Sequence, residues 1–215
     1  MFGESRMKSF NSDQVQGRVS HQLGRARRSA AWLGLSVLLA AGSAWAGAYA
    51  HVATYMTAKS PEHVLGVLTA YGQICDKGCK YYGPDVKEFI QLSQKKSENS
   101  WYTWTWVTNA VRDVKYFNKV TKTVKTDGTL LLVTHQLDES DQALIDELSK
   151  ATGKPHAPAF DKGKTIFVIR TQEDGKTKVV QDMSMTASGM IDMFGDKIKD
   201  GMKAGAAATF KNIEK

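Results

Sequence analysis

The chain has 215 residues, of which 42% are hydrophobic and 24% are charged, and its formal net charge is +7. The first 46 residues hold six Lys or Arg against two Asp or Glu, a net charge of +4, so residues 47–215 carry only about +3. Nucleic-acid-binding proteins gather basic side chains on one face. Here the lysines after residue 46 are spread among acidic residues, and we expect no nucleic-acid partner.

The N-terminal segment has the pattern of a secretory signal. Arg27 and Arg28 precede an apolar run over residues 30–41, and small residues follow up to Ala46. This order is typical of a cleaved signal peptide, and the run is shorter than the roughly 20 apolar residues of a membrane-spanning helix. We expect cleavage of residues 1–46, with a site after Ala50 as the alternative, and secretion across the inner membrane into the periplasm. An uncleaved anchor is the competing interpretation.

The next segment predicts a strand followed by a helix. Residues 48–58 are small or favour β-structure. Ser60, Pro61 and Glu62 then supply a hydroxyl cap, a proline at the first helical position and an acid in the first turn, which is a usual way for a helix to begin. We expect this helix to end near Gly72.

The two cysteines, Cys75 and Cys79, follow this helix with three residues between them. In an exported protein such a pair predicts a local disulfide, and Gly78 favours the turn that the bridge needs. A metal site or a redox pair is the alternative. The pair has no nearby histidine for a metal, and redox pairs usually have two intervening residues.

Strand patterns dominate the rest of the chain before a final helix. Two hairpins are predicted around Asp127-Gly128 and Asp174-Gly175. The segment 138–163 between them, helical at first, is either a lid or a disordered excursion. Apolar residues at three- and four-residue steps predict a long helix over 190–214. The predicted strands are 86–92, 101–107, 116–124, 130–137, 165–170 and 179–185.

Two segments carry a resemblance to a known superfamily. Residues 58–71, which include Ser60-Pro61-Glu62 and end at Tyr71, resemble the strand-to-helix junction of the START-like (SRPBCC) proteins, and the closing helix resembles theirs. The resemblance implies an α+β helix-grip fold. In that fold a curved antiparallel sheet of about six to seven strands wraps around a long C-terminal helix. Residues 47–215 would form one such domain with an insertion at 138–163. A cone-shaped fold of the NTF2 or cystatin kind is the rival.

The best candidates for lining a ligand pocket are three aromatic residues on one face of a predicted strand. Tyr102, Trp104 and Trp106 alternate with Thr103 and Thr105, and aromatic walls suit flat apolar ligands. Two alternatives remain. The rings could fill the space under the closing helix, or they could lie on the convex face of the sheet with the threonines inside.

Further candidates lie on a strand and on the closing helix. His135 sits in an apolar strand, where it could act as an acid or a base inside the cavity or be a hydrogen-bonded core residue. The closing helix adds flexible and bulky apolar groups suited to a promiscuous pocket. Its ligand-binding candidates are Met190, Phe194, Ile198 and Met202.

The sequence contains no phosphate-binding, zinc-protease or nucleophile-elbow motif. We therefore expect no catalytic set, no metal and no cofactor. The resemblance implies an exported bacterial domain that binds or carries a hydrophobic small molecule or lipid, and it leaves room for a transient contact with a membrane surface. The alternatives are a cyclase-like enzyme of the same fold and a ligand-free interaction module of the cell envelope.

Overall fold

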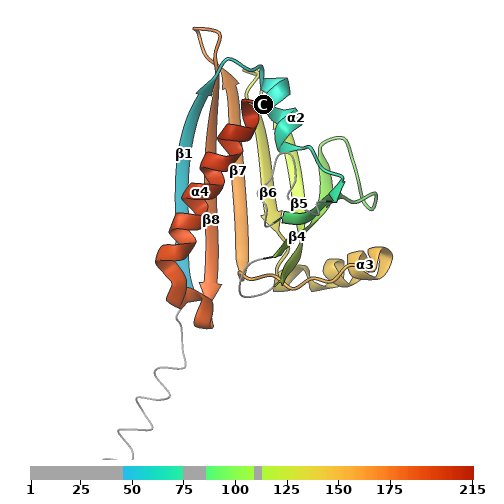
Figure 1. The fold of residues 1–215 in the computed structure, drawn as a ribbon. Coiled ribbons are helices and arrows are strands. Elements are labelled where there is room, and N and C mark those ends of the chain that lie inside the picture. The colour runs from blue at the N-terminus through green and yellow to red at the C-terminus, as the bar shows by residue number, and fades with distance from the viewer. Residues whose placement is uncertain (1–45, 75–85, 109–112) are drawn as a thin grey trace, which may run out of the picture. The chain divides into compact units, whose positions relative to one another are not determined.

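The computed structural model describes residues 46–74, 86–108 and 113–215, and these form one antiparallel sheet with helices on both of its faces (Figure 1). The strand order is β1-β8-β7-β6-β5-β4-β3-β2. The sequence predicts six to seven strands, and the two-residue β2 at one edge brings the number to eight. The strands are β1 (Ala46–Thr57), β2 (Gln73–Ile74), β3 (Val86–Gln91), β4 (Ser100–Thr108), β5 (Asp113–Val124), β6 (Leu130–Gln136), β7 (Lys162–Thr171) and β8 (Thr177–Ser188).

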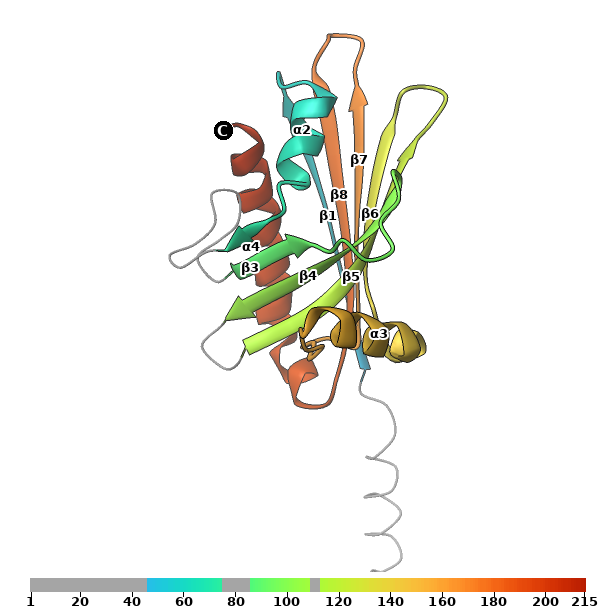
Figure 2. The same cartoon turned by 90° about the vertical axis from the view of Figure 1, so that its right-hand side faces the viewer.

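The C-terminal helix lies on the concave face of this sheet. The 3₁₀ helix η2 (Gly189–Phe194) leads into α4 (Gly195–Ile213), which runs along β1 and β8. Turned by 90°, the sheet is seen to curve so that β3, β4 and β5 cross obliquely in front of α4 (Figure 2). The predicted α+β helix-grip arrangement is therefore confirmed. No helix within the described ranges is long and apolar enough to cross a membrane.

The first helix, α2 (Pro61–Leu68), begins as the sequence predicts. Ser60 is the N-cap, and its Oγ accepts a hydrogen bond from the backbone N–H of His63 at 3.2 Å. His63 also ties the helix to the C-terminus, because its Nε2 lies 2.9 Å from the carbonyl oxygen of Ile213. The helix ends at Leu68, earlier than the predicted end near Gly72, and Gly72 lies in the following segment with a φ of 91°, a conformation that favours glycine. The two predicted hairpin turns likewise place Gly128 and Gly175 at positive φ.

The insertion between β6 and β7 packs mainly on the convex face. It begins with the 3₁₀ helix η1 (Glu139–Asp141), capped by Asp138, and continues as α3 (Gln142–Thr152). Ile145 and Leu148 of α3 are buried against Trp104 of β4 and Phe117 of β5. Because α3 covers the side of the sheet opposite α4, this helix is neither a disordered excursion nor a lid over the concave face.

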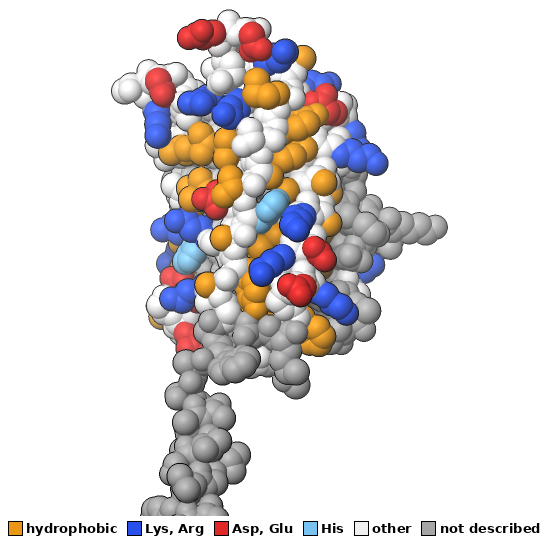
Figure 3. Space-filling model, turned by 90° about the vertical axis from the view of Figure 1, so that its left-hand side faces the viewer, with side chains coloured by type: hydrophobic (Ala, Val, Ile, Leu, Met, Phe, Trp, Pro, Cys, Tyr) orange, Lys and Arg blue, Asp and Glu red, His pale blue; other side chains and the backbone are white. Residues whose placement is uncertain are grey.

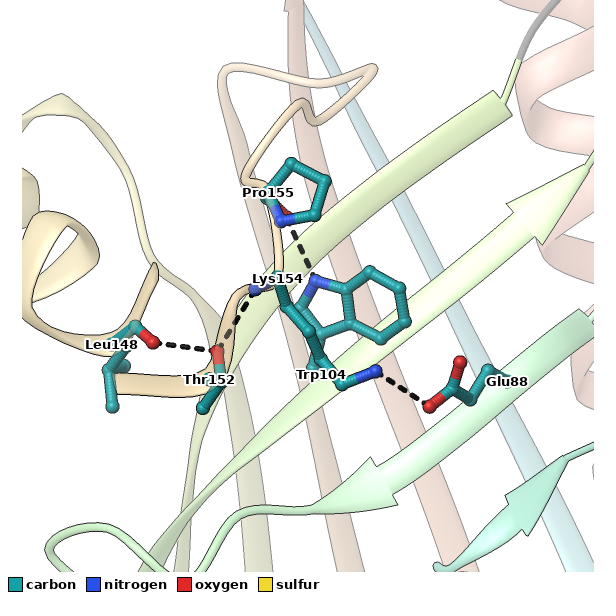
Figure 4. Close-up of polar contacts among 6 residues, drawn as sticks. All are labelled: Glu88, Trp104, Leu148, Thr152, Lys154 and Pro155. Atoms are coloured by element: carbon teal, nitrogen blue, oxygen red, sulfur yellow. Dashed lines mark hydrogen bonds and ion pairs between the residues drawn. The ribbon is translucent and has the colours of Figure 1, made fainter. Parts of the chain in front are cut away.

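The chain after α3 is fastened to β4 by a set of contacts drawn in Figure 4. Trp104 Nε1 donates a hydrogen bond to the carbonyl oxygen of Pro155 at 2.8 Å. Lys154 Nζ lies 4.1 Å from the centre of the Trp104 ring and 2.7 Å from Glu88 Oε1 on β3. Thr152 Oγ1 donates to the carbonyl oxygen of Leu148, and α3 ends at its C-cap Gly153, which has a left-handed conformation. These contacts fix the route by which the chain returns to the sheet.

The surface seen from the β1 side carries both signs of charge (Figure 3). Hydrophobic side chains lie there in small groups, with Lys, Arg, Asp and Glu interspersed among them. Val52 and Met56 on β1 are exposed. On this face no single sign of charge dominates, which agrees with the low net charge of residues 47–215.

Candidate ligand-binding cavity

The concave face of the sheet encloses a cavity of about 620 Å³. This volume lies within the range of roughly 300–1,000 Å³ that small-molecule sites occupy. Its walls come from α2, from strands β3 to β8, from the segment before β7, and from η2 and α4. The curvature of the sheet and the helix across it together create the space, as a helix-grip fold allows.

Two hydrophobic clusters close the ends of the concave face. At one end Val64 and Val67 of α2 pack with Ile213 of α4 against strand residues that include Ile169 and Val179. At the other end Tyr49, Met183, Ala187, Met202 and Ala206 form a second buried cluster. Between them the packing leaves the cavity open.

Apolar and aromatic side chains make up much of the cavity wall. Leu132 and Phe167 lie on the sheet, and Val67 and Tyr71 contribute from the α2 side. The Tyr71 ring meets the Phe89 ring edge-on, with 4.7 Å between their centres. Burial raises the pKa of Tyr71 to about 12, so its hydroxyl stays protonated and neutral over the physiological range. The wall therefore suits an uncharged, apolar ligand.

A band of polar side chains crosses this apolar surface from β4 to β8. Asn118 Nδ2 on β5 donates to Thr103 Oγ1 and Thr105 Oγ1 on β4, each at 3.3 Å. Asn118 pairs in register with Gln136 of β6, whose Nε2 donates to the carbonyl oxygen of Phe160 at 2.8 Å. Thr134 and Thr165, paired across β6 and β7, continue the band. These three side-chain hydrogen bonds each join one protein group to another.

Gln181 on β8 is the exception within this band. Its side chain lines the cavity and the residue is only 5% exposed. Its Nε2 donates to Met183 Sδ at 3.3 Å. Its Oε1 is buried and has no hydrogen-bond partner among the residues that the structure describes.

The described lining of the cavity contains no carboxylate and no histidine. Within the described ranges, no group of three or more His, Cys, Asp or Glu side chains could hold a metal ion. Tyr116, which lines the cavity, has its pKa raised by burial, so its hydroxyl also stays protonated. Lys164, which is exposed, is the one charged residue in the described lining, and the other lining residues offer apolar contact and neutral hydrogen bonding.

The aromatic face predicted to line the cavity lies on the other side of the sheet. Tyr102 and Trp104 pack against α3 on the convex face, and Trp106 packs against the same cluster. This prediction of a cavity wall is therefore corrected in favour of the alternative with the threonines inside. Thr103 and Thr105 face the concave side, because successive side chains of a strand alternate between faces. Thr105 lines the cavity.

His135 also lies outside the cavity. Its neighbours on β6, Thr134 and Gln136, both line the cavity, so His135 points to the convex face. There it lines a second pocket together with Lys162 and Lys164. Its predicted place in the cavity is corrected for the same reason of strand alternation.

Of the candidates on the closing helix, some line the cavity and others do not. Phe194 lines the cavity and is 52% exposed, which places it where the cavity meets solvent. Ile198 and Met202 pack in the cluster around Tyr49 instead, so the prediction that they line the cavity is corrected. Gly195 lets this end of the helix approach β1, since an added side chain would come within 3.0 Å of the Tyr49 hydroxyl oxygen. The side chain of Met190 lies outside the described residues.

Two further predictions fall outside the described ranges. Cys75 and Cys79, and with them the predicted disulfide, lie in the undescribed segment 75–85. The predicted signal peptide over residues 1–46 lies almost entirely before the described part of the chain.

The sequence reasoning missed the polar band. Asn118, Gln136 and Gln181 were not selected, although each is an amide side chain in a strand rich in apolar residues. Gln181 stands between Val179 and Met183 at two-residue steps, on the face that the strand pattern marks as buried. An amide at such a position is a signal that could have been read, because buried polar groups need partners.

Comparison with known proteins gives the fold a context. No protein-family model and no curated protein sequence matches this chain. A STAR-related lipid transfer protein from Xanthomonas axonopodis superposes with a TM-score of 0.56 at 12% identity, covering 80% of this chain and 96% of that one. Human StAR-related lipid transfer protein 5 gives 0.52 at 14% identity, with 88% and 96% covered. The Zhui aromatase/cyclase from Streptomyces sp. R1128 gives 0.51 at 13% identity, with 78% and 92% covered. The chain therefore has the START-like fold.

Proposed function

We propose that this protein binds and carries a hydrophobic small molecule or a lipid in the cavity on the concave face of its sheet. The observation that carries the proposal is the apolar cavity of about 620 Å³ between the sheet and α4. Two of the proteins with similar structures are named as lipid transfer proteins. Burying about 400 Å² of apolar ligand surface would contribute roughly 10 kcal/mol before the costs of ordering and desolvation.

A cyclase-like enzyme of the same fold is the main alternative, since one similar structure is named as an aromatase/cyclase. The described lining offers neutral amides and hydroxyls, has Lys164 as its one charged residue, and includes no carboxylate or histidine. General acid–base catalysis most often uses those groups. This difference in chemistry favours carriage over turnover.

The signal-like pattern of residues 1–46 supports a location beyond the inner membrane. We propose that residues 47–215 act there after cleavage, in transient contact with a membrane when ligand is exchanged. N-terminal sequencing of the protein from the envelope fraction tests cleavage. An intact N-terminus would favour the anchored form.

Native mass spectrometry of the protein purified from its own host's envelope, with solvent extraction of the bound material, tests carriage. We expect one copurifying apolar compound per chain. A protein that is empty, and whose melting temperature does not change with a panel of lipids and quinones, would contradict the proposal. A compound that changes chemically when incubated with the protein would favour the cyclase-like alternative.

A cavity-filling variant makes this test specific. Thr165 is a half-buried lining residue on β7, and Thr165→Phe places a ring in the cavity. We expect it to remove most of the copurifying compound. Thr54→Phe is the matched control, because Thr54 is exposed on the other face of the sheet, and it should retain the compound.

A further inference from the structure

We infer that the second pocket, on the convex face of the sheet, binds a phosphate group, either free in solution or carried by a lipid headgroup. This pocket has a volume of about 350 Å³ and is lined by residues of β1, β6, β7 and β8 and of no helix. Its polar side chains point away from the hydrophobic cavity. The inference therefore goes beyond the proposed function and does not depend on it.

Small residues form the floor of this pocket. Ala48 and Ala50 of β1 line it, and they pair in register with Thr186 and Ser184 of β8, which line it too. Directly paired residues point to the same face of a sheet. Side chains in strands stand roughly perpendicular to the sheet, so four short ones at neighbouring positions leave a hollow in its surface.

Three longer side chains on the same face stand beside this hollow. Lys164 of β7 pairs in register with His135 of β6 on one side and with Ser184 of β8 on the other. Lys162 lies two residues earlier on β7 and pairs with Thr186. Same-face neighbours on one strand are about 7 Å apart and adjacent strands about 5 Å apart. The flexible lysine side chains can therefore bring both ammonium groups over the same hollow.

The polar side chains of the lining can all donate hydrogen bonds. An ammonium group has three donors and no acceptor, an imidazole has at least one N–H, and each hydroxyl has one O–H. No carboxylate lines the pocket. A phosphate group has several acceptor oxygens in a tetrahedral arrangement, so it can accept from the lysines of β7 and from the hydroxyls of β8 at once. Lysine is a common ligand of phosphate groups in proteins.

The lysines of the pocket are available for an anion. Lys164 Nζ has no ion-pair partner among the residues that the structure describes. Lys162 Nζ lies 3.9 Å from Asp138 Oδ2, but the lysine side chain is 68% exposed. Asp138 Oδ1 also accepts hydrogen bonds from the backbone N–H and the hydroxyl of Ser140. Such a long contact to an exposed lysine contributes little, so an anion can displace it.

The charged residues around the pocket leave it positive. Asp182 lies two residues before Ser184 on the same face of β8 and is outside the lining. Lys119 of β5 is exposed and pairs in register with His135, so it adds a positive charge on the opposite side. These two charges offset each other, and the two lysines of the lining determine the local charge.

A double variant, Lys162→Gln/Lys164→Gln, tests the inference. Its control is Lys125→Gln/Lys211→Gln, which removes the same charge from exposed positions that line neither pocket. Isothermal titration calorimetry of the full chain at low salt measures binding of inorganic phosphate. Cosedimentation compares vesicles of phosphatidylcholine with vesicles of equal parts phosphatidylcholine and phosphatidic acid. This comparison cancels any apolar binding that is common to both vesicles.

We expect the unsubstituted protein and the control to bind one phosphate per chain, or to prefer the phosphatidic acid vesicles. The pocket variant should weaken that binding or that preference by about thirtyfold. Loss of phosphate binding in the calorimeter identifies a site for free phosphate, and an effect on vesicles alone identifies a site for a lipid headgroup. Absence of both kinds of binding, or equal losses in the two double variants, would overturn the inference.

A second variant tests the pocket without removing its lysines. Ser184→Glu places a carboxylate beside Lys164, where it competes with an anion. We expect the same loss of binding as in the double lysine variant, and unchanged binding would likewise overturn the inference. Ser184 is exposed, as are both lysines, so the variants should keep the melting temperature of the unsubstituted protein. Mass spectrometry of the compound in the cavity tests the proposed function separately.

Discussion

Trp104 and Trp106 provide a matched test of how the convex face is built. Both belong to β4 and face the same side, and each has a lysine nitrogen near its ring, at 4.1 Å for Trp104 and 4.4 Å for Trp106. They differ at the indole nitrogen. Trp104 Nε1 donates to the Pro155 carbonyl oxygen at 2.8 Å. Trp106 Nε1 is buried with no partner among the described residues.

Replacing each tryptophan with phenylalanine removes the same indole N–H. In Trp104→Phe this loses a hydrogen bond, whereas in Trp106→Phe it removes an N–H that has no partner among the described residues. Trp104→Phe loses a hydrogen bond, which costs about 1 kcal/mol net. Trp106→Phe removes an unpaired buried N–H, which relieves a desolvation cost of about 1–3 kcal/mol. The cation–π contact is weakened in both variants. The lost ring area acts in the same direction as the hydrogen bond, because Trp104 is 3% exposed whereas Trp106 is only partly buried. We expect Trp104→Phe to be less stable than Trp106→Phe by about 2–4 kcal/mol.

Urea unfolding of the two variants measures this difference, with a shift in midpoint at constant slope. Equal midpoints would refute the assigned role of the Trp104–Pro155 bond. A second measurement, the affinity of each folded variant for the flat apolar probe pyrene, checks the placement of the rings. We expect no change in affinity, since both rings face away from the cavity. A tenfold loss in Trp104→Phe would return the aromatic face to the ligand site.

Three other predictions concern the segment around α3. Glu88→Gln should lower the free energy of unfolding by about 1 kcal/mol, because it breaks the 2.7 Å ion pair with Lys154, and added salt should narrow the difference. Burial lowers the pKa of His156 from its usual 6.5, and its Nδ1 accepts from the Phe117 N–H. The stability that His156 contributes is therefore fully present above pH 6.5, and it is lost as the pH falls through the lowered pKa of His156 in the folded protein. His156→Asn, which keeps an acceptor, should flatten the loss seen by urea unfolding below pH 6.5. Hydrogen bonds from Ser140 lower the pKa of Asp138 in the folded protein below 3.8. The stability that Asp138 contributes is therefore lost as the pH falls from 3.8 through this lower pKa. Asp138→Asn should remove this acid-dependent step from the same urea titration.

The sequence predicts the order of elements well because most of the signals are local. Ser60 and Pro61 define the start of α2, and the Asp-Gly pairs define two hairpin turns, through short-range chemistry that packing does not override. The predicted boundaries of the helices and strands agree less well with the structure. β5 begins at Asp113, where residue 116 was predicted, because pairing with β4 continues as far as Thr108.

The choice of cavity-lining residues failed for a reason rooted in the fold. When helices cover both faces of a sheet, both faces of a strand are buried, and hydrophobicity no longer identifies the concave side. β4 shows this directly, since Trp104 is 3% exposed on one face and Thr103 is fully buried on the other. The assumption that the most apolar face of a strand lies on the concave side therefore predicts the wrong face of β4 for the cavity.

Two separate features of the sequence, considered together, would have resolved the ambiguity. Residues 142–150 form an amphipathic helix that needs an apolar partner, and the aromatic face of β4 needs a cover. Each satisfies the other: Ile145 and Leu148 are buried against the cluster that contains Tyr102 and Trp104. Assigning the insertion to the aromatic face leaves the threonine face for the concave side. The polar face of β4, less conspicuous in the sequence, then belongs to the cavity, where Asn118 and Gln181 extend it across the sheet.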